Sequence, residues 1–455
     1  MQKKADRIAI CIITVMMAMQ LSLFKIFAKF IPIFNYSYNT PLLCALYVLM
    51  IGAVYVLVIG GRCRKRADTE DENEAVSEAD EGSGNGSRLQ MAAIVNTCRD
   101  IMKDNSCLSF ELLTIILAIA LTDAVTIING QLRFTNILTH NLDYFYVFLA
   151  LPIAILLKEE KWKFKDFADT LLLLTALSMV LRIFVMAYYG ATGIEIECIS
   201  RESSMEGWVR DGRIRVIPPC FIFISLPIAA YMCATVKGFL QKGLYALYGL
   251  LALFYVYFVW QSRMGLVYMA FGIGIMVMFG ATSKKLNAAR WIAAVLAGFA
   301  ALLLGAGKLF MRLFSIDPST AAYFGENRGH YYAYDIFWGH FRQNFLTGCG
   351  LNETLSLGVY TEVDTKRIWL TDAGILYSLE PMGILIGIFF LLIFARGIYV
   401  YLTGRKSDYM AILPLALTAT VLVCEISIDC FFTPLAFSVP FYIAVVEYVA
   451  GRKGR

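Results

Sequence analysis

Long runs of apolar residues recur along the whole chain of 455 residues, and they constrain the fold more than any other feature. A helix needs about twenty such residues to cross the hydrocarbon layer of a bilayer. Charged residues make up 16% of the sequence, whereas about a quarter is usual in soluble domains. This composition predicts an all-α polytopic membrane protein. It argues against a disordered chain, a nucleic-acid-binding module and a secreted disulfide scaffold.

About twelve runs have the length and hydropathy expected of transmembrane helices. The apolar part of the first run is too long for a cleaved signal peptide, and no small-residue cleavage site follows it. The predicted spans lie at 8–31, 41–60, 108–128, 141–157, 168–188, 217–236, 243–260, 264–282, 290–307, 372–395, 409–428 and 431–449.

The positions of Lys and Arg predict how the helices are oriented. Cytoplasmic segments of membrane proteins carry an excess of these residues. A cytoplasmic N-terminus places most of the 40 Lys and Arg on that side, so both termini are expected inside the cell and the membrane is expected to be the cytoplasmic one. The inner residues are then those of segments 62–103 and 158–165, with Lys3, Lys4, Arg7, Lys237, Lys242, Lys284, Lys285, Arg290, Arg396, Arg405, Lys406, Arg452, Lys453 and Arg455.

Five segments follow from this topology. Residues 1–60 form the first two helices, and 61–107 read as a disordered acidic cytoplasmic loop that begins with a basic cluster. Residues 108–307 supply helices three to nine. Residues 308–371 form an extracytoplasmic cap loop with aromatic residues at helical spacing, which predicts partly helical structure. Residues 372–455 form the last three helices and a basic cytoplasmic tail.

The second long outer loop, at 189–216, carries arginines on the side where positive charge is disfavoured. Arginine binds phosphate oxygens in a planar, bidentate geometry that lysine does not reproduce. Arg215 stands just before a membrane helix, a position that suits an anionic lipid head group. The loop contains Arg201, Arg210, Arg213 and Arg215, of which we expect Arg201 and Arg210 to pair with acids of the same loop.

Arg263 stands in an almost loopless connection between two apolar helices. A charged group at that depth is costly unless it has a partner or a function, although its side chain could also reach ordinary lipid phosphates. Asp372, at the outer end of the tenth predicted helix, has two interpretations. It could cap the helix N-terminus, or act as a general base toward a sugar hydroxyl. Gly348 and Gly350 permit a tight turn close to a ligand or to another backbone segment.

The order of these motifs resembles the family of O-antigen ligases and O-antigen (surface polysaccharide) polymerases. The similarity covers roughly residues 190–400. The matching segments are Arg213-Ile-Arg215 before a helix, then Gln261-Ser262-Arg263-Met264-Gly265, then Arg328…Trp338…Phe345-Leu-Thr-Gly348-Cys-Gly350, and then Asp372…Leu379-Glu380…Gly383-Ile-Leu-Ile-Gly387.

The resemblance implies a GT-C-like, metal-independent membrane glycosyltransferase without a cofactor. It would polymerise or transfer polyprenyl-diphosphate-linked oligosaccharides on the outer face of the membrane. By this resemblance Arg263 and Asp372 are catalytic, and Asp372 stands in place of the family's loop histidine, which favours a polymerase over a lipid A ligase. The implied partners are the lipid-linked glycan donor and acceptor, the bilayer, a flippase and a chain-length regulator. The implied substrate-binding residues are Arg213, Arg215, Arg328, Trp338, Glu380, Glu425 and Asp429.

Glu425 and Asp429 are acids four residues apart in or near the eleventh predicted helix. Such acids could contact a sugar, form a proton path or pair with a cation such as Arg182. The histidines and cysteines show no zinc spacing, and both His330 and His340 are expected to be solvated or packed. A flippase or other polytopic transporter is the main alternative, and a structural scaffold is the next. The sugar, the linkage and the oligomeric state do not follow from the sequence.

Overall fold

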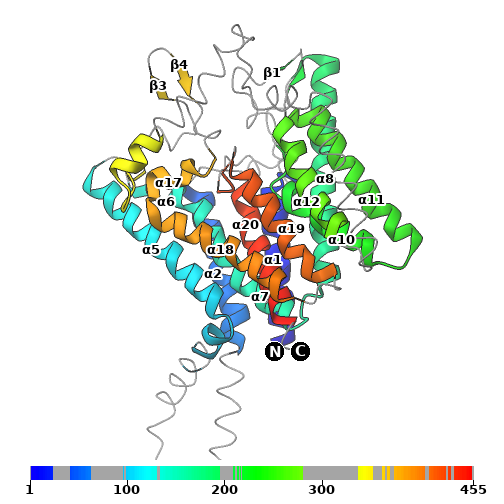
Figure 1. The fold of residues 1–455 in the computed structure, drawn as a ribbon, viewed down its shortest axis with the longest axis horizontal. Helices are drawn as coiled ribbons and strands as arrows, with labels where there is room; N and C mark the ends of the chain where they lie inside the picture. The colour runs from blue at the N-terminus through cyan, green and yellow to red at the C-terminus, as the bar shows by residue number, and fades with distance from the viewer. Residues whose placement is uncertain are drawn as a thin grey trace, which may run out of the picture.

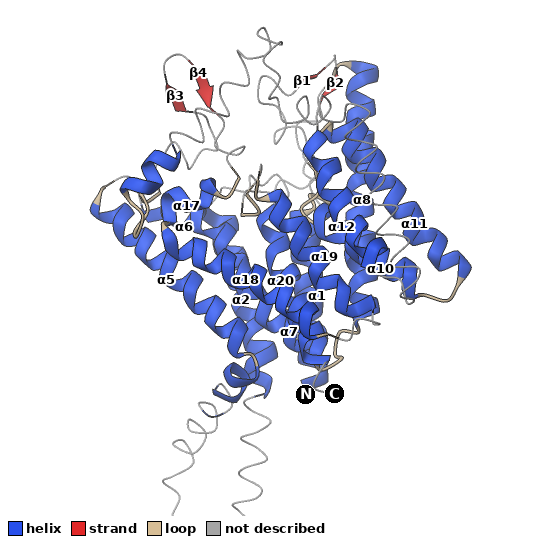
Figure 2. Ribbon diagram, in the orientation of Figure 1, coloured by secondary structure: helices blue, strands red, loops and turns tan. Residues whose placement is uncertain are grey.

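In the computed structural model, the described residues are helical apart from two short β-hairpins and the connecting turns (Figure 2). Strand β1 (Val209–Arg210) pairs with β2 (Arg213–Ile214), and β3 (Thr361–Val363) pairs with β4 (Lys366–Ile368), each antiparallel. The residues described are 2–23, 41–62, 96, 99–130, 134–194, 209–210, 213–214, 216, 218–279, 337–351, 361–363, 366–368, 374–404, 409–426, 429–431 and 435–452.

The helices follow the predicted apolar runs. The first half contains α1 (Gln2–Gln20), α2 (Pro41–Tyr55) with η3 (Val56–Gly60), α5 (Ser106–Ile128), α6 (Phe134–Phe145), η4 (Tyr146–Leu149), α7 (Ala150–Lys158) and α8 (Phe164–Thr192). The second half contains α10 (Ile222–Thr235), α11 (Phe239–Phe254), η5 (Tyr255–Trp260), α12 (Arg263–Phe279), α17 (Leu376–Met382), α18 (Ile384–Thr403), α19 (Tyr409–Cys424), η8 (Leu435–Ser438) and α20 (Val439–Gly451). A further short helix covers 337–343.

Six helical segments within the described residues are long and apolar enough to cross a membrane. They are Leu43–Gly60, Ser106–Ile128, Asn141–Lys158, Phe164–Thr192, Phe239–Trp260 and Ile384–Thr403. Four shorter apolar helices accompany them, and many of the outward side chains are large and apolar, such as Leu49 and Leu173. The fold is therefore that of an α-helical membrane protein. The count of twelve spans stays a prediction, and the ninth, at 290–307, lies outside the described residues.

The tenth predicted span is not one continuous helix. Helix α17 ends at Met382 and α18 begins at Ile384, with Gly383 between them at φ 67° and ψ −158°. That backbone conformation is accessible to glycine and interrupts the helix. Pro381, which lacks an N–H group, precedes the break. The apolar span thus starts after residue 383, and α17 forms a separate short element.

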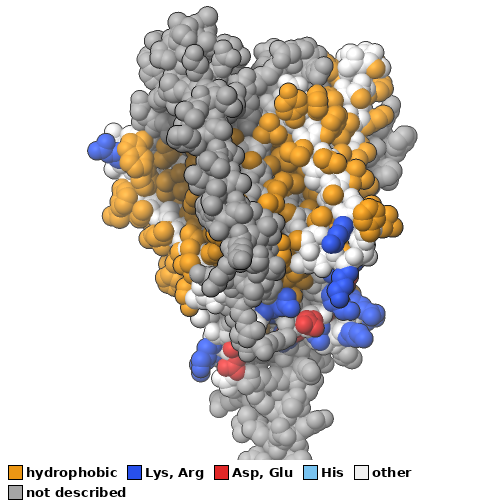
Figure 3. Space-filling view, turned by 45° about the vertical axis from the view of Figure 1, so that its right-hand side comes forward, with side chains coloured by type: hydrophobic (Ala, Val, Ile, Leu, Met, Phe, Trp, Pro, Cys, Tyr) orange, Lys and Arg blue, Asp and Glu red, His pale blue; other side chains and the backbone are white. Residues whose placement is uncertain are grey.

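The bundle has two distinct ends. Both termini lie at one end, which we call the termini end, and the two hairpins lie at the opposite end, which we call the hairpin end (Figure 1). Segment 337–351 and helix α17 lie toward the hairpin end. In the face shown in Figure 3, apolar side chains cover the helices and most of the visible Lys and Arg gather toward the termini end. This arrangement agrees with the predicted separation of the basic segments from the long loops, whereas the cytoplasmic side itself stays a prediction.

Ion pairs hold the helices together at the termini end. Arg62 donates to Glu159 at 2.7 Å and 2.6 Å and lies 3.4 Å from Asp6. Glu447 on α20 accepts from Arg396 on α18 at 2.6 Å and from Lys158 on α7 at 3.2 Å. Removing one member of a buried pair leaves an uncompensated charge, so such pairs fix their helices strongly. Lys158 also donates to Asn105 at 2.7 Å, which brings the start of α5 into the same network.

Candidate functional site

A histidine and a buried glutamate form a pair at the hairpin end. His340 Nδ1 lies 2.8 Å from Glu380 Oε1. The histidine side chain is 50% exposed, whereas that of Glu380 is 3% exposed. A carboxylate that accepts from Nδ1–H orients the ring and leaves Nε2 as the basic nitrogen. The pair therefore combines a fixed imidazole with access to the surface, which is the arrangement of a general base.

Backbone hydrogen bonds position this pair. Segment 344–351 lies against α17, because Cys349 N donates to the carbonyl of Glu380 at 2.8 Å and Gly350 N donates to that of Pro381 at 3.1 Å. Ile384 N donates back to the carbonyl of Phe345 at 2.9 Å. Gly348 has φ 69°, and a Cβ added to it would lie 2.2 Å from the Pro381 carbonyl oxygen. The predicted turn at Gly348 and Gly350 thus approaches another backbone segment closely.

The ionisation of these groups reflects their burial. Glu380 lies in α17, before the apolar span, and burial raises the pKa of its carboxyl, while the hydrogen bond from His340 and its charge act in the opposite direction. Burial, assisted by the charge of Glu380, raises the pKa of the Cys349 thiol to about 11. Cys349 is therefore a thiol at neutral pH and is poorly suited to act as a nucleophile. His340 is therefore the candidate base at this site on geometric grounds, because its ring is held by Glu380 and is half exposed.

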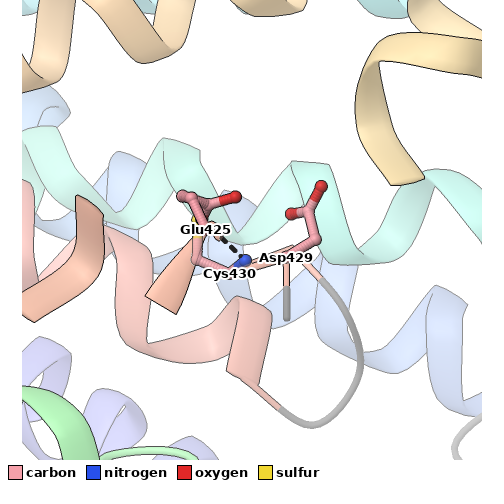
Figure 4. Close-up of side chains that lie close together, drawn as sticks. All are labelled: Glu425, Asp429 and Cys430. Atoms are coloured by element: carbon pink, nitrogen blue, oxygen red, sulfur yellow. Dashed lines mark hydrogen bonds between the residues drawn. The ribbon is translucent and has the colours of Figure 1, made fainter. Parts of the chain in front are cut away.

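Two further carboxylates lie beside α17. Glu425 follows the end of α19, and its Oε1 accepts the N–H of Cys430 at 2.8 Å (Figure 4). Asp429 is fully buried, and its two oxygens accept the N–H groups of Phe431 at 2.7 Å and Ser378 at 3.0 Å. Ile375 N also donates to the Glu425 carbonyl at 2.9 Å. The turn after α19 is thus bonded directly to the helix that carries Glu380.

A buried tyrosine extends this polar region toward α6. Tyr144 OH lies 3.3 Å from Ser378 Oγ, and the Tyr144 ring packs against Phe431 with a centroid distance of 4.8 Å. Since Ser378 N donates to Asp429, the tyrosine and the carboxylate share one partner residue. A connected set of polar groups therefore runs from α6 through α17 to the turn that follows α19.

The connection before Arg263 is as tight as predicted. Helix η5 ends at Trp260 and α12 begins at Arg263, with Gln261 at φ 52° between them. Ser262 Oγ accepts the N–H of Gly265 at 3.0 Å, as an N-cap does. Val216 N donates to the carbonyl of Val259 at 3.3 Å, so the end of the 189–216 loop lies beside this connection. The backbone next to residue 215 therefore lies beside Val259 near the end of η5, four residues before residue 263.

The predicted site residues fall into two groups. Those whose side chains are described are Trp338, which is 49% exposed, and the buried Glu380, Glu425 and Asp429. Arg215, Arg328 and Asp372 lie outside the described residues, as do the side chains of Arg213 and Arg263. Helix α17 begins at Leu376 with Ile375 in the N-cap position, and both interpretations of Asp372 stay predictions.

Sequence reasoning missed one partner of a candidate residue. His340 was expected to be solvated or packed, whereas it pairs with Glu380. Forty residues separate the two, and no periodic pattern joins them. His340 lies within the motif that ends at Gly350, and Glu380 lies within the motif that begins at Asp372, and this is the only sequence signal that could have suggested the contact. Arg182, which was considered as a partner for Glu425 or Asp429, donates hydrogen bonds to Ser178 at 3.2 Å and to Ser22 at 3.5 Å, and its pairing with either acid stays a prediction.

Comparison with known proteins leaves the function open. No family model matches the chain, and no curated protein matches it either. Residues, geometry and the family resemblance of the motifs are therefore what a functional proposal must rest on.

Proposed function

We propose that the protein is a membrane glycosyltransferase that polymerises or transfers polyprenyl-diphosphate-linked oligosaccharides on the extracytoplasmic face. The observation that carries the proposal is the His340–Glu380 pair, a half-exposed imidazole oriented by a buried carboxylate in a membrane protein. Sugar transfer from a diphosphate needs a base for the acceptor hydroxyl and cations for the leaving group. The arginines before α10 and at the start of α12 are the candidate cations.

In the proposed reaction the acceptor hydroxyl oxygen attacks the anomeric carbon of the donor sugar. The bond from that carbon to the diphosphate oxygen breaks, and polyprenyl diphosphate leaves with both electrons of the bond. His340 Nε2 takes the hydroxyl proton, and Glu380 stabilises the imidazolium that forms. Arg215 and Arg263 balance the negative charge that develops on the leaving group. Electrostatic stabilisation by these guanidinium groups means that the step requires no metal ion at the diphosphate.

The neighbouring backbones near residues 215 and 263 support a joint role for the two arginines. Val216 N donates a hydrogen bond to the carbonyl of Val259. Arg215 directly precedes Val216, and Arg263 follows Val259 by four residues. Two guanidinium groups on adjacent segments can donate hydrogen bonds to the same diphosphate from two sides. Asp372 stays a second candidate base, because it belongs to the same motif as Glu380.

The proposal is tested with purified protein in detergent. A polyprenyl-diphosphate-linked repeat unit is supplied as donor and acceptor, and products are followed by mass spectrometry. Elongation is expected in the wild type. Arg263→Lys should reduce it at least tenfold because bidentate geometry is lost. Arg342→Lys, which changes an exposed arginine next to Phe341 on the 337–343 helix, serves as the matched control and should retain activity.

The base is identified by two further variants. His340→Gln should reduce the rate about a hundredfold or more, within the range that general-base catalysis supplies. Asp372→Asn should leave most activity if His340 is the base, and the reverse pattern would assign the role to Asp372. Detergent removes any compartment to transport into. Wild-type protein that elongates no suitable repeat unit would therefore refute the transferase and favour the transporter.

A further inference from the structure

Three possible metal ligands converge in the turn after α19. The ligand atoms of Glu425, Asp429 and Cys430 all lie within 4.8 Å of one another, and all three residues are buried (Figure 4). They come from one short stretch in which a glutamate is followed four residues later by Asp-Cys. The search of the sequence for a zinc site considered the spacing of histidines and cysteines. It did not find this set, because two of the three residues are acids.

One atom of the set is buried without a partner. Glu425 Oε2 has no hydrogen bond, although Glu425 is 5% exposed and its Oε1 accepts from the Cys430 backbone. In Figure 4 the Glu425 carboxylate extends toward Asp429. A buried carboxylate oxygen without a donor costs several kcal/mol in general. An oxygen aimed at a second carboxylate forms a place where a cation can bind between them.

The donor set selects the kind of cation. Two carboxylate oxygens and one sulfur suit a borderline-soft ion such as Zn²⁺, whereas Mg²⁺ and Ca²⁺ prefer oxygen ligands alone. Zinc binds oxygen at about 2.0–2.2 Å and sulfur at about 2.3 Å. Ligands of a tetrahedral ion are then about 3.3–3.8 Å apart, so closing from 4.8 Å requires only side-chain adjustment. The two carboxylates and the Cys430 thiolate together carry three negative charges, of which a divalent ion neutralises two.

We infer that Glu425, Asp429 and Cys430 bind a divalent transition-metal ion, with Zn²⁺ preferred. The ion strengthens the attachment of α17 to the end of α19. That attachment already includes the bond from Ile375 N to the Glu425 carbonyl and the bond from Ser378 N to Asp429 Oδ2. The inference is independent of the proposed glycosyl transfer, and no step of that reaction is assigned to the ion.

The experiment uses the full-length protein in detergent. After dialysis against a chelator, the protein is titrated with Co²⁺, which reports thiolate ligation through a sulfur-to-metal charge-transfer band. In a separate titration with Zn²⁺, the number of bound zinc ions per chain is measured by elemental mass spectrometry. One equivalent of Zn²⁺ per chain is expected. The charge-transfer band should appear with Co²⁺ and disappear when Zn²⁺ is added in excess.

Two variants and one control locate the site. Cys430→Ser should remove the charge-transfer band, and Glu425→Gln should lower the affinity for Zn²⁺ at least tenfold. Cys424→Ser is the matched control, because Cys424 is buried at the end of the same helix and does not belong to the set. It should bind Zn²⁺ as the wild type does. Should Glu425→Gln fail to fold, Cys430→Ser decides the question alone.

Absence of stoichiometric Zn²⁺ in the wild type would overturn the inference. So would a charge-transfer band that survives in Cys430→Ser, since the thiolate ligand would then be another cysteine. These measurements need no glycan substrate. A failed transferase assay with normal zinc binding would therefore refute the proposed function and leave the metal site standing.

Discussion

Gly348 gives the sharpest test of how the His340–Glu380 pair is positioned. Replacing it by alanine adds a Cβ that would lie 2.2 Å from the Pro381 carbonyl oxygen and 2.6 Å from Gly383 N. Both atoms belong to the backbone of α17 and its end, so no side chain can move aside. Alanine at φ 69° also pays about 1 kcal/mol for its positive φ. The 344–351 segment must therefore move away from α17.

The size of the effect follows from the bonds that would break. Movement by about 1 Å disrupts the three backbone hydrogen bonds that join the segments, from Cys349 N to Glu380, from Gly350 N to Pro381 and from Ile384 N to Phe345. At about 1 kcal/mol each, they add about 3 kcal/mol to the cost of the positive φ. The total of about 4 kcal/mol corresponds to an equilibrium constant for opening of this contact that is about a thousandfold larger.

Hydrogen exchange followed by mass spectrometry measures this opening. Amides of 349–350 and 384 should exchange about a thousandfold faster in Gly348→Ala than in the wild type. Gly339→Ala is the matched control, because Gly339 lies in the adjacent helix with nothing within 4 Å of an added Cβ. It should leave exchange unchanged or slower, since alanine favours helix by up to about 1 kcal/mol. Wild-type exchange in Gly348→Ala would refute the docking of 344–351 on α17.

Three other predictions follow from the ionisable groups and from the two ends of the bundle. Burial raises the pKa of Glu380 in the folded protein above its ordinary value of 4.5, so the ionised carboxylate destabilises the folded state. The wild-type free energy of unfolding should therefore increase as the pH falls from the raised pKa toward 4.5. Thermal unfolding of Glu380→Gln should lack this pH dependence, and an unchanged profile would contradict the assignment. Glu447→Gln should lower the free energy of unfolding by about 3 kcal/mol, because Arg396 and Lys158, each with a side chain 20% exposed, lose a buried carboxylate partner. Lys165→Ala removes an exposed pair and should change the free energy of unfolding by less than about 1 kcal/mol. The third prediction is tested in a background from which the exposed native cysteines have been removed. An impermeant maleimide applied to intact cells should label the Trp338→Cys variant but not the Lys103→Cys variant. Labelling of both variants would contradict the placement of the two ends on opposite sides of the membrane.

The helices could be predicted from the sequence because each apolar run carries its own signal. Eleven of the predicted spans contain described helix, although their ends differ by several residues, as in α8, which extends to Phe164 and Thr192 rather than 168 and 188. Hydropathy does not report backbone geometry. The break at Gly383 was missed because Pro381 and Gly383 interrupt the helix without interrupting the apolar run.

The candidate site was only partly predictable. Glu380, Glu425 and Asp429 could be selected because acids in apolar segments are costly and therefore informative. Their partners could not be selected, since the pairing of His340 with Glu380 and of Ser378 with Asp429 depends on how 344–351 and the turn after α19 dock on α17. Docking between segments that are tens of residues apart leaves no periodic trace in the sequence.

The buried carboxylates at the two ends of the bundle are stabilised in different ways, and the difference indicates where ligands act. At the termini end Glu447 is neutralised by Arg396 and Lys158. At the hairpin end, within the part of the chain that the structure describes, Glu425 and Asp429 have no Lys or Arg as a salt-bridge partner and accept mainly backbone N–H groups. The first arrangement leaves no uncompensated buried charge, whereas the second leaves two carboxylates without a counter-ion among the described residues. A buried carboxylate cluster supported by backbone dipoles is better explained by a cation or ligand that binds there.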